Sequence, residues 1–363
     1  MRITIILPAD SLAGGIRVLA LYAQRLAAKG HLVNVVQPRH RSPSLPQIIR
    51  SLRAEHRWPE NPNQRYSHFD SLGQQNLRRI VLSHAGPVTE ADVPDADLVL
   101  ASWWETAEWV WALPPSKGVK AHFMQDYEIW GGNIERVDAT CRLPMPKIVI
   151  ANWVADLLSS RFGQVAAAII PNSVDTKVFA APPRGKRPVP TVGFTYSPMR
   201  SKGADIAIAA INLARAKLPA LNAMCFGAAR ATRDLPVPAS CTFHYSLPDS
   251  ELPGVYGSCD SWLFATRKEG FGLPILEAMA CRTPVIGSPA GAAPELIARG
   301  GGILVPMEDP EAMATAIVSV AGMSEQEWRA LSDAAHANAN TYTWDRATER
   351  FEAALLEIRS KHG

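Results

Sequence analysis

The stretch that decides the fold is residues 269–297, which read EGFGLPILEAMACRTPVIGSPAGAAPELI. A short apolar run, Ser261–Ala265, precedes it and is typical of a buried strand. Gly270 and Gly272 then predict a loop with little side-chain bulk, and Pro274 suits the first turn of a helix, where its missing N–H costs nothing. The stretch therefore predicts a strand, a glycine loop and a helix whose N-terminus is open to a ligand.

The N-terminus of this helix predicts an anion site. Free backbone N–H groups are expected at Gly272, Leu273 and Ile275, at the positive end of the helix, where phosphate groups bind. Glu277 is expected in the first turn, where a carboxylate can accept hydrogen bonds from two neighbouring hydroxyls, such as those of a ribose. The alternative is that Glu269 and Glu277 are solvated carboxylates favoured by the helix dipole alone.

Strand and helix signals alternate on both sides of this stretch. Strands are expected in the first half at 3–7, 32–36, 97–101, 120–124, 147–151 and 169–170, with a helix over 16–28. In the second half, strands are expected at 191–194, 223–227, 261–265, 284–286 and 302–305, and helices at 204–216, 274–281, 294–298 and over most of 310–361. This alternation predicts two α/β domains with parallel sheets. Residues 39–80 show few periodic signals and are expected to form long loops with one or two short helices.

The bulk properties of the chain exclude several classes of function. The 363 residues suit two domains, and a hydrophobic fraction of 47% provides enough apolar material for two cores. The net charge of +3 gives no global field for nucleic acid. No stretch approaches the roughly 20 apolar residues that a membrane span needs, so membrane contact would be peripheral. The five cysteines are odd in number and include no Cys-x-x-Cys pair, which argues against a zinc site or a disulfide framework and favours a reducing cytosol.

The stretch 269–297, with Glu269 and Glu277 eight residues apart, resembles the signature of the retaining GT-B glycosyltransferases of family 4, the glycosyl transferases group 1. Further similarities run along nearly the whole chain: the Gly14-Gly15 pair, the segment PNSVD from Pro171, the Lys202-Gly203 helix start and the Tyr256…Asp260 approach to the signature strand. The resemblance implies an α/β, GT-B fold, with two Rossmann-like doubly wound domains facing across a cleft.

The resemblance also implies how the domains divide. Residues 1–170 plus a C-terminal helix at 345–363, which crosses back, are expected to form the acceptor-binding domain. Residues 171–344 are expected to bind the nucleotide sugar. Within this range, the basic, proline-rich stretch 180–189 has the composition of a linker and predicts a domain boundary there.

On the donor side, the resemblance implies a role for each candidate residue. Glu277 would hold the ribose hydroxyls, Glu269 would contact hydroxyls of the donor sugar, and the amides of Gly272 and Leu273 would hold the distal phosphate. Lys202 and Arg200 would neutralise the departing diphosphate. Family members usually carry the arginine directly after the strand glycine, where Phe194-Thr195 stand here. The match to the family is therefore closer for Lys202. For Arg200, the alternative is an ordinary exposed cation at a helix N-terminus.

In the first domain, the resemblance places the loop of Gly14 and Gly15 against the diphosphate and the sugar. These glycines let the backbone approach a ligand closely. Family members often have a histidine after the strand 120–124, where Gln125 or Asp126 stands here, as in some bacterial rhamnosyltransferases of the family. A 6-deoxy sugar has no 6-hydroxyl to recognise, which fits this change. Asp126 as a residue that only caps the end of the strand is the alternative.

Two groups of residues can be interpreted in two ways. Several tryptophans of the first domain form either an acceptor platform or part of the core: Trp103, Trp104, Trp109, Trp111 and Trp130. The arginine-rich stretch 39–79 either binds an anionic group, in a membrane lipid or a lipid-diphosphate acceptor, or is a solvated surface.

Together these expectations describe a retaining glycosyltransferase that moves a sugar from a nucleotide-diphosphate sugar to a glycan or lipid-linked acceptor. The donor is a substrate, and neither a cofactor nor a metal is expected. The family context implies bacterial surface polysaccharide or glycoconjugate synthesis, in the cytoplasm or at the cytoplasmic face of the inner membrane, without nucleic acid. The alternatives are a catalytically degenerate GT-B subunit that binds sugar nucleotides, a GT-B epimerase, which would need further acid/base groups, and a phosphorylase, which would need a pyridoxal lysine.

Overall fold

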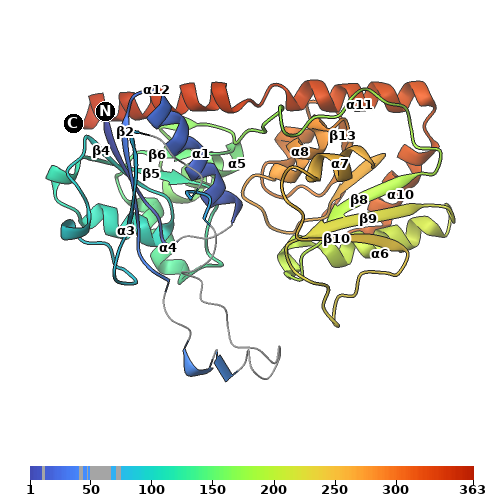
Figure 1. Ribbon diagram of the computed structural model, residues 1–363, viewed down its shortest axis with the longest axis horizontal. Helices are drawn as coiled ribbons and strands as arrows, with labels where there is room; N and C mark the ends of the chain where they lie inside the picture. Colours follow the sequence, from blue (N-terminus) through green and yellow to red (C-terminus); the bar gives the residue numbers. More distant parts are fainter. Residues whose placement is uncertain (10–12, 41–43, 47, 50–66, 71–74) are drawn as a thin grey trace. The chain divides into compact units, whose positions relative to one another are not determined.

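The computed structural model describes residues 1–9, 13–40, 44–46, 48–49, 67–70 and 75–363 (Figure 1). The chain divides into two compact units. Unit 1 comprises residues 1–149, 154–170 and 348–363, and unit 2 comprises residues 150–153 and 171–347. In the described parts of the chain, no helix has the length and apolar character needed to cross a bilayer.

Unit 1 is built on a parallel sheet. Its described residues form seven strands in the order β3-β2-β1-β4-β5-β6-β7. The strands are β1 (Arg2–Ile6), β2 (Leu32–Gln37), β3 (Leu77–Val81), β4 (Leu98–Ala101), β5 (Val119–Met124), β6 (Lys147–Val149) and β7 (Ala168–Ile169). The helices are α1 (Gly14–Ala28), α3 (Trp104–Ala112), α4 (Ile134–Arg142), most of α5 (Asn152–Phe162) and most of α12 (Trp344–His362), with short 3₁₀ turns at Glu90–Asp92 and Pro115–Lys117.

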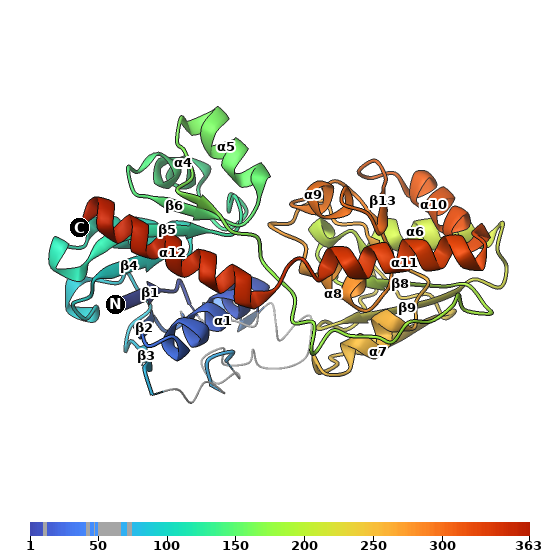
Figure 2. The same ribbon diagram turned by 90° about the horizontal axis from the view of Figure 1, so that it is seen from above.

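Both faces of the unit 1 sheet are covered, because side chains alternate along each strand. On one face, Tyr22 of α1 stacks on Phe351 of α12 with ring centroids 4.2 Å apart, and Phe123 of β5 meets both rings edge-on. The helices α1 and α12 thus lie side by side on this face (Figure 2). On the other face, Ala101 of β4 packs in a cluster with Val110 of α3.

Unit 2, whose residues are all described, repeats this winding. Its six parallel strands follow the order β10-β9-β8-β11-β12-β13. They are β8 (Thr191–Thr195), β9 (Asn222–Gly227), β10 (Cys241–Tyr245), β11 (Ser261–Phe264), β12 (Val285–Gly287) and β13 (Gly302–Leu304). The helices are α6 (Ala204–Arg215), α7 (Leu252–Gly257), α8 (Leu273–Ala280), α9 (Ala293–Ile297), α10 (Pro310–Gly322) and α11 (Glu325–Ala339), and the 3₁₀ turn η4 (Arg200–Lys202) precedes α6.

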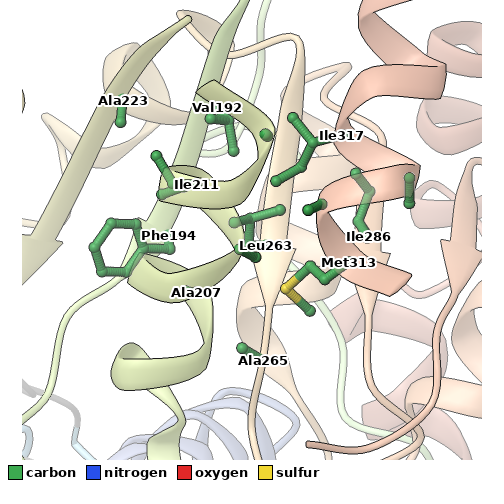
Figure 3. Close-up of a cluster of buried hydrophobic side chains, with 14 of the residues drawn as sticks. Val192, Phe194, Ala207, Ile211, Ala223, Leu263, Ala265, Ile286, Met313 and Ile317 are labelled. Carbon is green, nitrogen blue, oxygen red and sulfur yellow. The ribbon is translucent and has the colours of Figure 1, made fainter. Parts of the chain in front are cut away.

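Two different cores hold the helices of unit 2 on its sheet. On one face, aliphatic side chains of α6 and α10 pack on Phe194, Leu263 and their neighbours (Figure 3). On the opposite face the core is aromatic. Trp262 of β11 stacks on Phe226 at 5.3 Å and lies 4.4 Å from Tyr256 of α7, measured between ring centroids.

Two strands that the sequence pattern did not predict lie at sheet edges. The expectation of loops and short helices over residues 39–80 is wrong at 77–80, because these residues belong to β3, which pairs with β2. Likewise, β10 pairs with β9 at the edge of unit 2. Both strands mix polar and apolar residues, LRRIV and CTFHY, because an edge strand of a parallel sheet is less buried than an inner one. Most of the basic stretch 39–79 lies outside the described residues.

The linker expected at residues 180–189 is instead a packed part of unit 2. Arg184 pairs with the buried Asp260 at 3.3 Å and lies over the ring of Trp328. Lys186 Nζ donates to the carbonyls of Ala321 and Met323 near the end of α10. The basic residues that suggested a solvated linker are therefore anchors, since a cation at a helix C-terminus satisfies its free carbonyls.

Substitution of Gly203, between η4 and α6, tests the close packing beyond the carboxyl end of β11. It has a φ of +67°, and a Cβ there would lie 1.9 Å from the carbonyl oxygen of Ala265. We expect Gly203→Ala to lower the free energy of unfolding by about 2–4 kcal/mol, from left-handed strain plus overpacking. Urea unfolding measures this. The control is Gly254→Ala, whose Cβ meets nothing within 4 Å in α7 and which should be neutral or stabilising. Equal stability of the two variants would show that position 203 does not require a glycine.

Candidate functional site

The candidate residues of unit 2 lie beyond the carboxyl ends of β8 and β11, the two strands at which the strand order reverses. Turn η4 follows β8, and the loop 265–272 follows β11. From there α6 leads to the face lined by Leu263, whereas Gly272 at the start of α8 lies against Phe264, the next residue along the strand. This is the topological switch point of a doubly wound sheet, where ligands bind.

Lys202 and Glu269 meet at this edge. Lys202 Nζ lies 2.7 Å from Glu269 Oε2, and both side chains are partly exposed. The pair joins the turn after β8 to the loop after β11. Arg200 stands two residues earlier in the same turn, is exposed, and its guanidinium forms no ion pair with any described residue. The structure therefore brings Lys202 and Glu269 together and leaves Arg200 at the surface.

Glu277 is held inside the unit. It is only 8% exposed, and its Oε2 accepts a hydrogen bond of 2.8 Å from the hydroxyl of Tyr256. The helix begins at Leu273, so Glu277 lies in the second turn and not in the first. In the sequence, Tyr256 is recognisable only as part of the Tyr256…Asp260 similarity to the family. Its bond to Glu277 spans 21 residues, and no local pattern indicates it.

The N-terminus of α8 differs from the sequence expectation at one amide. The N–H of Ile275 donates to the carbonyl of Gly272 at 3.0 Å, so it is not free. Gly272 itself is the N-cap residue, with a φ of +102° that an L-residue rarely adopts. The amides of Gly272 and Leu273 remain at the helix end, where an anion is favoured by the dipole.

The loop before α8 is fixed by its neighbours. The indole N–H of Trp153 donates to the carbonyl of Gly270 at 2.8 Å, and the amide of Ala292 donates to the carbonyl of Phe271. Gly291 packs so closely that a Cβ there would lie 2.5 Å from the carbonyl oxygen of Glu269. The backbone that carries Glu269 is thus rigidly placed, which suits a preorganised site.

The candidate residues of unit 1 comprise a neutral pair, Gln125 and Gly15, and the carboxylate of Asp126. Gln125 Nε2 donates to the carbonyl of Gly15 at 3.0 Å, and Gln125 Oε1 is buried without a donor among the described residues. Gly14 and Gly15 are the first residues of α1 and not a loop before it. Asp126 accepts from the amide of Tyr127 at 2.7 Å and from the indole of Trp130 at 3.2 Å. Gln125 and Gly15 are therefore in contact, and Asp126 organises the turn after β5.

The tryptophans of unit 1 divide between core and surface. Trp104 is buried, with the Arg136 guanidinium over its ring. Trp103 and Trp130 pack edge to face with centroids 5.0 Å apart, and Trp130 is 61% exposed. Trp111 is also exposed, beneath the ammonium of Lys120.

Comparisons with known proteins identify a matching sequence family and the fold. Residues 189–322 match the sequence family described as "Glycosyl transferases group 1". A sucrose-phosphate synthase structure from Thermosynechococcus elongatus superimposes with a TM-score of 0.73 at 19% identity, over 99% of this chain and 100% of that one. The chain has the GT-B fold. Anabaena HepE in complex with UDP and glucose is similar at a TM-score of 0.70 and 15% identity, over 98% of this chain and 100% of HepE.

Curated relatives share shorter stretches with this GT-B chain. The O-antigen chain mannosyltransferase B of Escherichia coli is 33% identical over 103 residues, which are 28% of this chain and 26% of the relative. The GDP-mannose-dependent alpha-(1-6)-phosphatidylinositol monomannoside mannosyltransferase of Mycolicibacterium smegmatis is 29% identical over 195 residues, or 46% of this chain and 50% of the relative. The chain thus spans between a quarter and half of the length of these relatives.

The hydrogen bond between Tyr256 and Glu277 predicts a stability effect. We expect Tyr256→Phe to lower the free energy of unfolding by about 1–3 kcal/mol, because it removes a donor from a buried carboxylate. Urea unfolding followed by tryptophan fluorescence measures this. Tyr245→Phe, which removes the hydroxyl of an exposed tyrosine, is the matched control and should change stability by under about 0.5 kcal/mol. The same loss in both variants would show that the bond to Glu277 contributes nothing.

Proposed function

We propose that the protein is a glycosyltransferase that transfers a sugar from a nucleotide-diphosphate sugar to a glycan or lipid-linked acceptor, with retention of the anomeric configuration. The observation that carries the proposal is the set of Lys202, Glu269 and Glu277 at the switch-point edge of unit 2, within the range that matches the group 1 glycosyltransferases. The GT-B structures with UDP and the GDP-mannose-dependent relative support a nucleoside diphosphate as the leaving group.

Each donor contact follows from the chemistry of its residue. Glu277, aimed by Tyr256, accepts hydrogen bonds from the ribose hydroxyls. The amides of Gly272 and Leu273 at the start of α8 hold the distal phosphate. Lys202 neutralises the charge that develops on the departing oxygen, and Glu269 accepts hydrogen bonds from the donor sugar. Arg200, two residues from Lys202 and exposed, is a second cation available to the diphosphate.

The proposed reaction needs no side-chain nucleophile. The bond between the anomeric carbon and the diphosphate oxygen breaks ahead of attack, and the acceptor hydroxyl attacks on the face from which the diphosphate departs. The acceptor proton passes to an oxygen of the departing phosphate. Because a fixed lysine and helix amides meet the developing charge, we propose that a divalent metal is not required.

In unit 1 we propose that Gly14, Gly15, Gln125 and Asp126 contact sugar. The amide of Gln125 and the start of α1 offer neutral hydrogen-bonding groups, which suit hydroxyls better than phosphates. The exposed Trp130 beside Asp126 offers an aromatic face next to a carboxylate, a combination suited to stacking and hydrogen bonding with an acceptor glycan. A lipid-linked acceptor would imply peripheral membrane contact and a role in surface polysaccharide or glycoconjugate synthesis, as the name of the E. coli relative suggests.

Calorimetry without metal tests the donor site, with UDP, GDP, dTDP and ADP and their sugars, including a dTDP-linked 6-deoxy sugar, as the panel. We expect one base to bind, and Glu277→Ala to weaken that binding at least about a hundredfold, through loss of the ribose contact and of the Tyr256 partner. Glu311→Ala, on the exposed first turn of α10, is the control and should bind as wild type. Absence of binding across the panel would overturn the proposal. Binding without turnover on any acceptor would indicate the degenerate subunit instead.

Lys202→Ala tests the reaction itself. We expect kcat to fall by about 10²–10³-fold, the cost of removing one preorganised group from the developing charge. Wild-type turnover should persist in EDTA, and NMR of the product should show the same anomeric configuration as the donor. Lys217→Ala, after α6 and exposed, is the control variant. An inverted product, or activity that EDTA abolishes, would contradict the proposed mechanism.

A further inference from the structure

Arg267 is the most heavily bonded arginine near the site, and neither the sequence signature nor the proposed donor contacts use it. Its side chain is only 14% exposed. One nitrogen, Nη1, donates to the carbonyl of Arg200 at 2.6 Å and to Asp205 Oδ1 at 2.8 Å, and Nη2 donates to Asp205 Oδ2 at 2.7 Å. Its Nε donates to Glu308 at 2.8 Å. One side chain therefore connects four segments of unit 2.

The backbone reinforces the same connection. The amides of Arg267 and Lys268 donate to the carbonyl of Ser201 at 2.9 and 3.3 Å. Ser201 is the central residue of η4, and the carbonyl of Arg200 in the same turn accepts from the Arg267 guanidinium. Turn η4 is thus fastened to the segment after β11 at Arg200 and Ser201, the two residues directly before Lys202.

The charges around Arg267 keep this connection ionised. Its hydrogen bonds to Asp205 hold the pKa of that carboxyl below its usual range, and the same bonds, with Glu308, raise the pKa of the guanidinium. The guanidinium reaches the two oxygens of Asp205 with two nitrogens and has a further N–H for each remaining partner. A lysine ammonium cannot reproduce this fork.

We propose that Arg267 is a positioning residue that holds turn η4 so that the Lys202 ammonium stands where the distal phosphate of the donor binds. This inference rests on the proposed function and deepens it. Arg267 does not touch the donor. It acts through Lys202 and therefore on the diphosphate, whereas Tyr256 and Glu277 act on the ribose at the other end of the nucleotide.

The competing explanation is that Arg267 only stabilises unit 2. The two explanations differ in what they predict for ligands of different length. A loss of stability alone affects a nucleoside monophosphate and a nucleoside diphosphate alike, because both need the same folded unit. A displaced Lys202 weakens the diphosphate selectively, because only that ligand reaches the lysine.

The experiment measures dissociation constants of the nucleoside diphosphate and monophosphate of the base that binds, by calorimetry on the full chain. We expect Arg267→Gln to weaken the diphosphate about tenfold and the monophosphate less than about twofold. Arg267→Lys should behave like Arg267→Gln, because the fork is lost. Arg282→Gln is the matched control. Arg282 lies just beyond the C-terminal end of α8, its side chain has the same exposed fraction of 14%, and it pairs with Asp333. It should change neither constant.

A double-mutant cycle identifies the route of the effect. In a Lys202→Ala background, Arg267→Gln should weaken diphosphate binding no further, because the group through which it acts is absent. Asp205→Asn, which keeps the guanidinium but removes its strongest partner, should weaken the diphosphate about two- to fivefold and serves if Arg267→Gln fails to fold.

The outcomes are distinguishable. Equal weakening of both ligands by Arg267→Gln, or additive effects of the two substitutions, would overturn the positioning role. So would an Arg267→Gln or Asp205→Asn variant that binds diphosphate as wild type while Lys202→Ala weakens it, and that result would leave the proposed function standing. A wild-type chain that binds no nucleotide would overturn the proposed function and this inference together.

Discussion

The close approach of Gly203 to the carbonyl of Ala265 is the constraint on which the site of unit 2 depends. A Cβ at this position would lie 1.9 Å from that oxygen, so only a glycine lets the turn after β8 come against the end of β11. The left-handed φ of Gly203 then ends η4 and starts α6 within one residue. With the two segments this close, Ser201 accepts from the amides of 267 and 268, and Lys202 reaches Glu269. The approach of these two segments therefore depends on the absence of a Cβ at residue 203.

The two units share the same strand order, but different chemical groups lie beyond the strands at which this order reverses. In both, a serine hydroxyl joins the strand ends near the site: Ser102 donates to the carbonyl of Ile6 in unit 1, and Ser288 donates to the carbonyls of Phe264 and Thr266 in unit 2. Unit 2 then places charged groups beyond these ends, whereas the candidates that meet in unit 1 are an amide and a glycine carbonyl, Gln125 and Gly15. Charged groups suit a diphosphate, and neutral ones suit sugar hydroxyls. The different ligands proposed for the two units therefore follow from different side chains on a repeated scaffold.

Much of this fold could be predicted from the sequence, because inner parallel strands are continuous apolar runs between glycine turns. The helix after Gly272 is predictable from Pro274, and its start differs from the expectation by a single residue. The edge strands β3 and β10 escape this reasoning because they are only half buried. The stretch 180–189 misleads it, since proline and cations are shared by solvated linkers and by segments whose cations are anchored, as Lys186 is.

Candidate site residues can be proposed from the sequence where one local segment carries them, but not where the fold brings distant segments together. Glu269, Gly272 and Glu277 lie in one signature, and the resemblance of that signature to a known family implies their roles. The bond from Tyr256 to Glu277 spans 21 residues, and that from Arg267 to Asp205 spans 62. Such partners depend on which strands are neighbours. The sequence alone does not distinguish Arg267, which is bonded within the fold, from Arg200, which is exposed.

Two of the cations beyond the ends of β8 and β11, Lys202 and Arg267, differ in how firmly they are held. The pair of Lys202 and Glu269 is partly exposed, and such a pair contributes at most about 1 kcal/mol, so a phosphate can replace the carboxylate at little cost. Replacement would free Glu269 for a sugar hydroxyl at the moment when the lysine meets the diphosphate. Arg267 is more buried, is bonded to two carboxylates and a carbonyl, and has no such freedom. A site of this kind keeps its framework while one ion pair changes partners, and under the proposed function donor binding would place Lys202 and Glu269 for the transfer.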